Sequence, residues 1–236
     1  IVVPAQGGSF TEGIVGTPRF INPLLAQSQA EQDLTILLFS GLMRPLADGS
    51  LVPDLAESYE VSEDGTAYTV VLRSDATFHD GTPVTADDVV FTIQRAQDSV
   101  LQSPQEEIWA GIGVESLDTR TVVFTLSRPY GAFLENLTIG ILPRHLWQNV
   151  ISEEFGAHML NTEPIGSGPF RLSNVKRIKS GIPTMYTLTA FNKSTRGRPH
   201  INEIRIRVFG NEKEVVNAYI DNDIDSLDGL DPKDAD

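Results

Sequence analysis

The stretch of sequence that decides the fold reads Phe78-His79-Asp80-Gly81-Thr82-Pro83-Val84-Thr85-Ala86-Asp87-Asp88-Val89. Asp80 and Gly81 form a dipeptide that is typical of tight hairpin turns. Thr85 stands directly before Ala86, and Asp88 follows Thr85 at the spacing of a helix capping box. The stretch therefore predicts a tight turn that is followed within a few residues by a helix beginning at Ala86.

Strand and hairpin patterns lie on both sides of this turn and helix. A second dipeptide, Asp64-Gly65, predicts a hairpin between residues 59–61 and 68–72, and alternating apolar residues predict another between 113–118 and 121–126. Further strands are predicted at 9–15, 186–191 and 201–209, and helices at 30–42, 132–137, 145–149 and 212–219. The last sixteen residues hold seven aspartates and predict a solvated loop or a frayed end. The pattern indicates a mixed fold of the α+β class.

The composition excludes several classes of function. The chain has 236 residues, 32 acidic against 18 basic, and a formal net charge of −14, which disfavours nucleic acid as a partner. It contains no cysteine, so disulfides and thiolate metal sites are excluded. No apolar run reaches the roughly 18 residues that span a bilayer. Because the chain begins at Ile1 without a methionine, we expect it to start inside a longer precursor.

Several segments occur in an order that resembles the bacterial extracellular solute-binding proteins of family 5, which serve peptide and nickel ABC transporters. The resemblance spans nearly the whole chain, and it depends on the order of the segments more than on any one of them. Besides residues 78–89, the segments are Ile21-Asn22-Pro23-Leu24, Phe39-Ser40-Gly41-Leu42 with Asp48-Gly49, Pro53-Asp54-Leu55-Ala56-Glu57-Ser58-Tyr59, Asp64-Gly65 followed by Leu72-Arg73, Pro164-Ile165-Gly166-Ser167-Gly168-Pro169-Phe170, and Ala218-Tyr219 leading to Ile224-Asp225.

The resemblance implies the first lobe of a two-lobed fold like that of periplasmic binding proteins. Residues 1–42 and 164–236 are expected to form a β-rich core and residues 43–163 an inserted subdomain, with the second lobe absent from this chain. A single lobe offers one wall of a cleft, so we expect this chain alone to bind solute weakly.

The same resemblance implies a function in transport without catalysis. The protein would capture extended peptides, or a related small solute, and deliver them to an ABC permease and its ATPase. It would be an exported monomer in the periplasm or at the cell surface, without metal or cofactor, and a lipid anchor on the precursor is left open. Two alternatives are a domain that presents peptide to a sensor and a hydrolase.

Two places are predicted to contact the ligand. Gln27-Ser28-Gln29 follow the Asn22-Pro23 segment, where relatives run an extended strand along the bound peptide; the alternative is a surface loop that leads into the helix. Trp109 is predicted to line a side-chain pocket, and the alternative is that it fills the core.

The other motif residues are predicted to be structural. They are Asn22, Pro23, Asp80, Gly81, Thr85, Asp88, Gly166, Gly168 and Pro169. The glycines would supply a positive φ or a close backbone approach. A hydrolase would have to use His79, Asp80 or Ser167, but Ser167 lies outside the Gly-x-Ser-x-Gly pattern, and the four histidines lack metal-ligand spacing.

Overall fold

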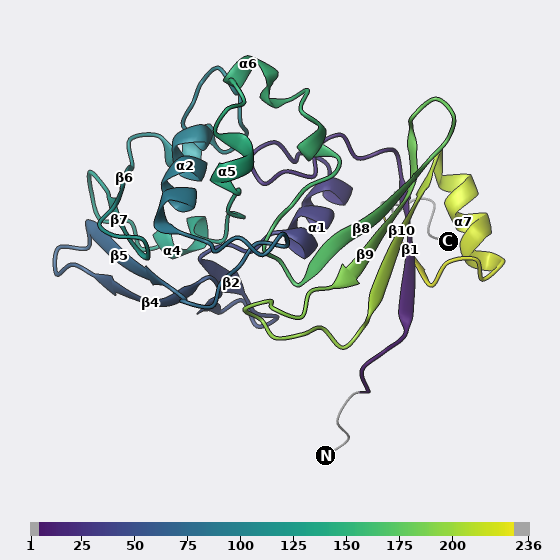
Figure 1. Cartoon of the computed structure of the whole chain (residues 1–236), viewed down its shortest axis with the longest axis horizontal. Coiled ribbons are helices and arrows are strands. Elements are labelled where there is room, and N and C mark those ends of the chain that lie inside the picture. The colour runs from purple at the N-terminus through teal and green to yellow at the C-terminus, as the bar shows by residue number, and fades with distance from the viewer. Residues whose placement is uncertain (1–4, 229–236) are drawn as a thin grey trace.

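The computed structural model describes residues 5–228 (Figure 1). Its largest sheet has five strands and brings residues 9–15 next to residues 203–209 and 226–227. Its strand order is β11-β1-β10-β9-β8, where β1 runs parallel to both β10 and β11, and β9 is antiparallel to both of its neighbours. The strands are β1 (Ser9–Val15), β8 (Phe170–Arg177), β9 (Pro183–Ala190), β10 (Glu203–Phe209) and β11 (Ser226–Leu227).

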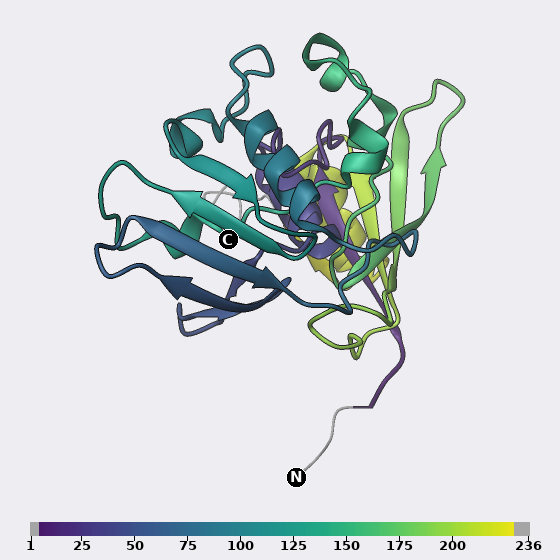
Figure 2. The same ribbon diagram turned by 60° about the vertical axis from the view of Figure 1, so that its left-hand side comes forward.

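Residues 43–125 form two smaller antiparallel sheets. The four-stranded sheet has the order β4-β5-β7-β6, and the predicted hairpins on both sides of the turn and helix are confirmed. Figure 2 shows this sheet with helix α2 (Ala86–Ala96) packed beside β6 and β7. The strands are β2 (Met43–Pro45), β3 (Leu51–Pro53), β4 (Ala56–Val61), β5 (Ala67–Leu72), β6 (Gly113–Ser116) and β7 (Thr121–Thr125).

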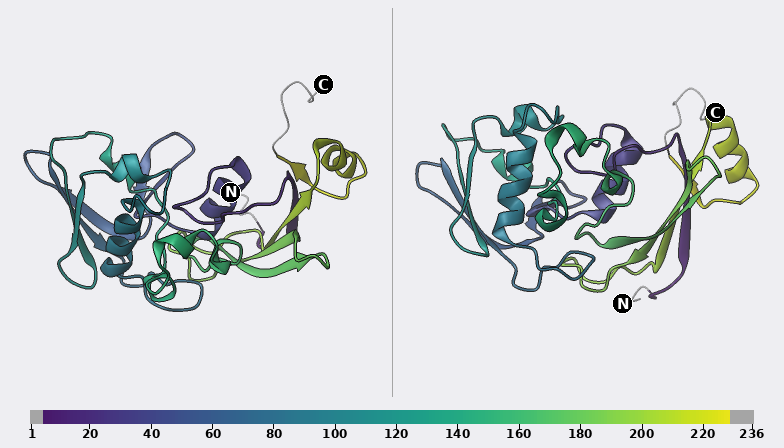
Figure 3. Two further views of the ribbon diagram at one scale, coloured as in Figure 1. Left: turned by 90° about the horizontal axis from the view of Figure 1, so that it is seen from above. Right: turned by 45° about the horizontal axis from the view of Figure 1, so that its top comes forward.

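The two larger sheets lie toward opposite ends of the molecule, with helix α1 (Gln29–Leu38) between them (Figure 3). One continuous cluster of buried apolar side chains includes residues of both sheets, so no solvent layer separates them. Residues 43–125 supply the strands of the two smaller sheets, and residues 9–15 and 170–227 supply those of the five-stranded sheet. The division into a core and an inserted subdomain itself stays a prediction.

Helix α2 begins at Ala86, as predicted. The backbone N–H and the hydroxyl of Thr85 donate to one carboxylate oxygen of Asp88, at 2.8 and 2.7 Å. The remaining helices are short except for the last. They are α3 (Glu106–Trp109), α4 (Phe133–Asn136), α5 (Arg144–Trp147), α6 (Ser152–Phe155), the 3₁₀ turn η1 (Met159–Asn161) and α7 (Glu212–Ile220). None of the helices within residues 5–228 is long and apolar enough to cross a bilayer.

The structure differs from the predicted elements in three places. Helix α1 ends at Leu38 instead of residue 42, because Phe39 has an extended backbone with φ −122°. Strand β8 was not predicted, since of its eight residues only Phe170 is buried. The acidic tail is not all loop: β11 pairs with β1, and Ile224 is buried. Residues 229–236 of that tail lie outside the described part.

Candidate functional site

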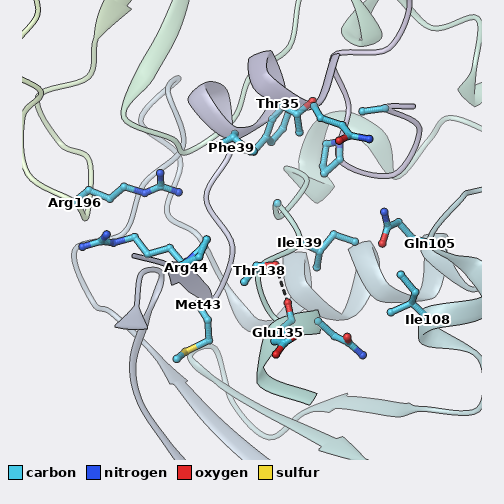
Figure 4. Close-up of a pocket in the computed structure, with 17 residues that line it drawn as sticks. Thr35, Phe39, Met43, Arg44, Gln105, Ile108, Glu135, Thr138, Ile139 and Arg196 are labelled. Atoms are coloured by element: carbon cyan, nitrogen blue, oxygen red, sulfur yellow. Dashed lines mark hydrogen bonds between the residues drawn. The ribbon is translucent and has the colours of Figure 1, made fainter. Parts of the chain in front are cut away.

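The candidate site is a partly open groove of about 490 Å³ between α1, β2, α3 and α4, drawn in Figure 4. Apolar side chains of α1 and α3 form much of its wall, and charged side chains from β2, α4 and the loop after β9 complete it. The groove is lined by Pro23, Ala26, Gln32, Thr35, Ile36, Phe39, Met43, Arg44, Pro45, Gln105, Ile108, Glu135, Asn136, Thr138, Ile139, Gly140 and Arg196.

The carboxylate of Glu31 fixes the loop that leads into α1. Its Oε1 accepts hydrogen bonds from the backbone N–H of Arg19 and Phe20, at 2.8 and 3.0 Å, and its Oε2 from those of Gln27 and Ser28, at 3.0 and 3.1 Å. Burial by itself would raise the pKa of Glu31, but the four backbone hydrogen bonds bring this pKa below its ordinary value. The carboxylate of Glu31 therefore fixes the backbone of the loop that leads into α1.

The extended strand predicted for residues 27–29 is wrong. Ser28 is the N-cap of α1, where its hydroxyl accepts from the N–H of Glu31, and Gln29 is the first helical residue. The backbone donors of Gln27 and Ser28 are already bound to Glu31, so they are not free to pair with a ligand strand. The alternative, a loop that leads into the helix, is what the structure shows. The groove takes its side chain from Gln32, one turn further along α1.

Trp109 does not line the groove, so the predicted pocket role is wrong. Its side chain is fully buried, with its ring centroid 6.1 Å from those of both Phe124 and Phe133. The residues of the same segment that reach the groove are Gln105 and Ile108. Burying the large apolar area of an aromatic side chain is favourable, so the face of α3 that carries Trp109 packs against the core. The opposite face of α3 lines the groove.

Two glycines let the loop after α4 pack closely against the segment after α1. A Cβ on Gly41 would lie 2.6 Å from the carbonyl oxygen of Thr138, and one on Gly140 would lie 2.7 Å from Cβ of Phe39. Contacts this short exclude any side chain, so glycine at both positions allows the two segments to meet.

Of the three charged side chains that line the groove, only Arg196 forms an ion pair among residues 5–228. Nε and NH2 of Arg196 both lie 2.8 Å from Oδ2 of Asp54, whose side chain is fully buried and which also accepts from the hydroxyl of Thr195. Arg44 is half-buried and has no carboxylate within 4.0 Å among residues 5–228. Glu135 is exposed and belongs to no ion pair in the same part of the chain.

Asn22 and Pro23 hold the loop beside the groove. Asn22 is fully buried; its Oδ1 accepts from the N–H of Leu24 at 2.9 Å, and its Nδ2 donates to Oδ1 of Asn161 at 2.9 Å. An asparagine that bonds two residues ahead makes an Asx turn, which sets the direction of the following chain. Pro23 then contributes directly to the groove.

The glycine-rich segment before β8 packs against the end of α1. A Cβ on Gly166 would lie 1.9 Å from the carbonyl oxygen of Leu38, and one on Gly168 would lie 2.6 Å from that of Leu37. Neither glycine has a positive φ, so close approach is the alternative that the structure supports. The carbonyl of Pro169 accepts from the first residue after β9, at 2.8 Å.

His79 joins the turn before α2 to this glycine-rich segment. Its Nδ1 accepts from the N–H of Gly166 at 3.2 Å, so Nε2 carries the proton and donates to the carbonyl of Gly168, also at 3.2 Å. Burial lowers the pKa of His79 to about 4. The ring is therefore neutral near pH 7 and has both nitrogens engaged.

The three residues that a hydrolase would use do not form a nucleophile and base pair with one another. Asp80 and Gly81 form the predicted turn, in which Oδ1 of Asp80 accepts from the N–H of Thr82 and Gly81 has φ +91°. Oδ2 of Asp80 lies 2.7 Å from Nε2 of His145. Ser167 is buried, and its hydroxyl accepts from the backbone of Ser40. Ser167 and His79 thus bond to backbone groups instead of to each other. Among residues 5–228 no cluster of three or more His, Asp or Glu could hold a metal ion.

The structure thus combines a mixed α/β fold with a partly open groove that has an apolar wall and both paired and unpaired charged side chains. The chain belongs to the bacterial extracellular solute-binding proteins of family 5: the family model described as "family 5 Middle" matches residues 50–236. Proteins of this family are periplasmic or extracellular.

Three relatives show how far the similarity extends. The oligopeptide-binding protein AppA of Bacillus subtilis is 31% identical over 209 residues, which cover 87% of this chain and 38% of AppA. Its crystal structure with a nonapeptide aligns with a TM-score of 0.85 at 29% identity, over 94% of this chain and 44% of that one.

NikZ of Campylobacter jejuni, in complex with Ni(L-His), gives a TM-score of 0.81 at 30% identity, over 93% of this chain and 43% of that one. AgaA of A. tumefaciens R10, in complex with agropinic acid, gives 0.84 at 30% identity, over 97% and 45%. The chain thus spans less than half the length of these relatives.

Proposed function

We propose that this chain forms part of the solute-binding component of an ABC importer that captures extended peptides or a related small solute. The observation that carries the proposal is the groove, which combines an apolar wall with a few charged and polar groups, as small-molecule sites do. The relatives support a peptide, since AppA is a peptide-binding protein of the same family.

The shape of the groove supports closure by a second wall. Small-molecule sites enclose most of their ligand, whereas this groove is partly open to solvent. A second lobe that moves onto the groove would complete the enclosure, and hinge closure of this kind is common in periplasmic binding proteins. The core of residues 1–42 and 164–236 and the inserted subdomain of residues 43–163 would together form one wall.

The remaining parts of the proposal concern partners. The protein would deliver its solute, as a monomer, to a membrane permease that works with an ATPase. Gln27, Ser28 and Gln29 stand at the start of the groove-lining helix, so ligand contact by their side chains is compatible with their position. A lipid anchor on the precursor also belongs to the proposal. Biochemical analysis of the native protein would test it.

The test is mass spectrometry of the full-length protein, purified from its own host and then denatured to release any solute. We expect a mixture of short peptides. Ile36→Asp places a charge on the apolar groove wall and should abolish the carried peptides, whereas Ile220→Asp, at a comparably exposed position on α7 outside the groove, should retain them. An empty wild-type protein, a single non-peptide compound, or peptides retained by Ile36→Asp would contradict the proposal.

A further inference from the structure

One end of the groove carries an uncompensated positive charge. The side chains of Arg44 and Arg196 lie at the same end of the groove (Figure 4). Arg196 is neutralised by the buried carboxylate of Asp54, at 2.8 Å. Arg44 has no such partner among residues 5–228, so this end of the groove holds two guanidinium groups and one carboxylate, which pairs with Arg196 alone.

Arg44 differs from the other arginines of residues 5–228 that form no ion pair, because Arg19, Arg128 and Arg171 are exposed and Arg198 donates to three side-chain amide oxygens. With 32 acidic residues against 18 basic ones, most arginines have a carboxylate within reach, and seven other arginines of residues 5–228 form ion pairs besides Arg196. Arg44 is nevertheless half-buried in a groove wall, where a charge is less well solvated than on the open surface. An unpaired guanidinium in such a place favours an anionic partner from outside the chain.

Arg44 lines the groove from a short strand. It lies in the short strand β2, opposite Val52 of β3, and both of its neighbours in β2 also line the groove. A guanidinium offers a planar fork of N–H donors that fits a carboxylate with two parallel hydrogen bonds. The same groove exposes Ile36 and Ile108, with 61% and 47% of their surface accessible, which suit an apolar group of the same ligand.

We propose that Arg44 binds a carboxylate of the solute and so makes the groove selective for acidic ligands with a neighbouring apolar group. The proposal rests on the proposed function, because it assigns a ligand chemistry to the same groove. The carboxylate is either the C-terminus of a peptide or an acidic side chain, and the two sources are distinguished by the probes below.

The experiment is calorimetric titration of the full-length protein, stripped of carried solute, with three synthetic peptides. They are trileucine, trileucine amide, and the amide of the same peptide with glutamate at its centre. If Arg44 binds the C-terminus, trileucine binds at least about tenfold more tightly than its amide; if it binds a side chain, the glutamate peptide binds more tightly than trileucine amide by a similar factor.

The variants assign the selectivity to one residue. In Arg44→Gln the preference for the carboxylate should disappear, and in Arg44→Lys, which keeps the charge but not the fork, part of it should return. Arg128→Gln is the matched control, because Arg128 is exposed and does not line the groove. Unchanged urea unfolding midpoints would confirm that the variants fold.

Two results would overturn the proposal in different ways. If the wild-type protein binds these peptides without preferring a carboxylate, or if Arg44→Gln keeps the preference, the role of Arg44 is wrong and the proposed peptide function stands. If none of the three peptides binds to the wild-type protein, both the peptide function and the acidic ligand are wrong.

Discussion

Replacing His79 with glutamine should remove a pH-dependent part of the chain's stability. Glutamine also offers one acceptor and one donor, so it is suited to keeping hydrogen bonds to the backbone of Gly166 and Gly168. Unlike histidine, glutamine does not take up a proton. The substitution therefore tests the charge of the ring separately from its hydrogen bonds.

The magnitude follows from the pKa of the buried ring. Burial lowers the pKa of His79 from 6.5 to about 4, so below pH 6.5 the unfolded chain binds a proton that the folded chain does not. Stability is accordingly lost as the pH falls through this window, and the loss is complete below about pH 4. In full it amounts to about 3 kcal/mol, of which about 2 kcal/mol is lost between pH 8 and pH 5.

The assay is urea unfolding at a series of pH values, followed by fluorescence, for the wild type and for His79→Gln. Carboxylates such as Glu31 also titrate at the acidic end, but they contribute equally to both proteins and cancel in the difference. His200→Gln, which changes an exposed histidine, is the matched control. We expect the free energies of unfolding of wild type and His200→Gln to fall together and that of His79→Gln to fall less steeply.

Parallel curves for the wild type and His79→Gln would refute the reasoning, because they would mean that His79 takes up its proton equally in the folded and unfolded chain. Nuclear magnetic resonance titration of the His79 ring gives an independent check. A midpoint near 6.5 in the folded protein would contradict the buried, doubly hydrogen-bonded ring.

Three further substitutions test the packing by urea unfolding. Thr85→Ala should cost about 1 kcal/mol through the lost hydrogen bond between its hydroxyl and the carboxylate of Asp88, and an unchanged midpoint would mean that this bond does not hold the helix start. Arg196→Gln leaves the buried carboxylate of Asp54 unpaired and should cost about 3 kcal/mol, part of which Asp54→Asn in the same protein should restore. Gly166→Ala forces a methyl group onto the carbonyl of the α1 end and should cost at least about 2 kcal/mol, whereas Gly131→Ala, with open space around it, should cost little; equal effects would contradict the close approach.

The turn and helix at residues 78–96 were predictable because their signals are local. The Asp80-Gly81 turn and the contact between Thr85 and Asp88 each lie within four residues, so the interacting residues can be recognised in one short stretch of sequence. The hairpins around them follow from equally short patterns. Strand β8 escaped prediction because a half-exposed edge strand needs few apolar residues.

The groove could not be predicted in the same way, because its wall comes from segments that are distant in sequence. Arg44 and Arg196 are about 150 residues apart, and no pattern in either segment refers to the other. The error at residues 27–29 was avoidable: Ser28 and Glu31 have capping-box spacing, which predicts a helix start instead of a strand. Trp109 is a harder case, since only the fold decides which face of a short helix meets the core.

The place of β1 in its sheet sets an order on the folding of the chain. β1 is synthesised before the other strands of residues 5–228, yet it pairs with β10, whose residues follow roughly 190 positions later, and with β11 beyond that. The hairpins β4–β5 and β6–β7 close within a few residues and can form at once, whereas β1 has to wait through a long loop closure. β1 is therefore among the last of these strands to gain hydrogen-bonding partners, and a ribosome or a secretion channel that still holds residues 203–227 keeps the five-stranded sheet incomplete.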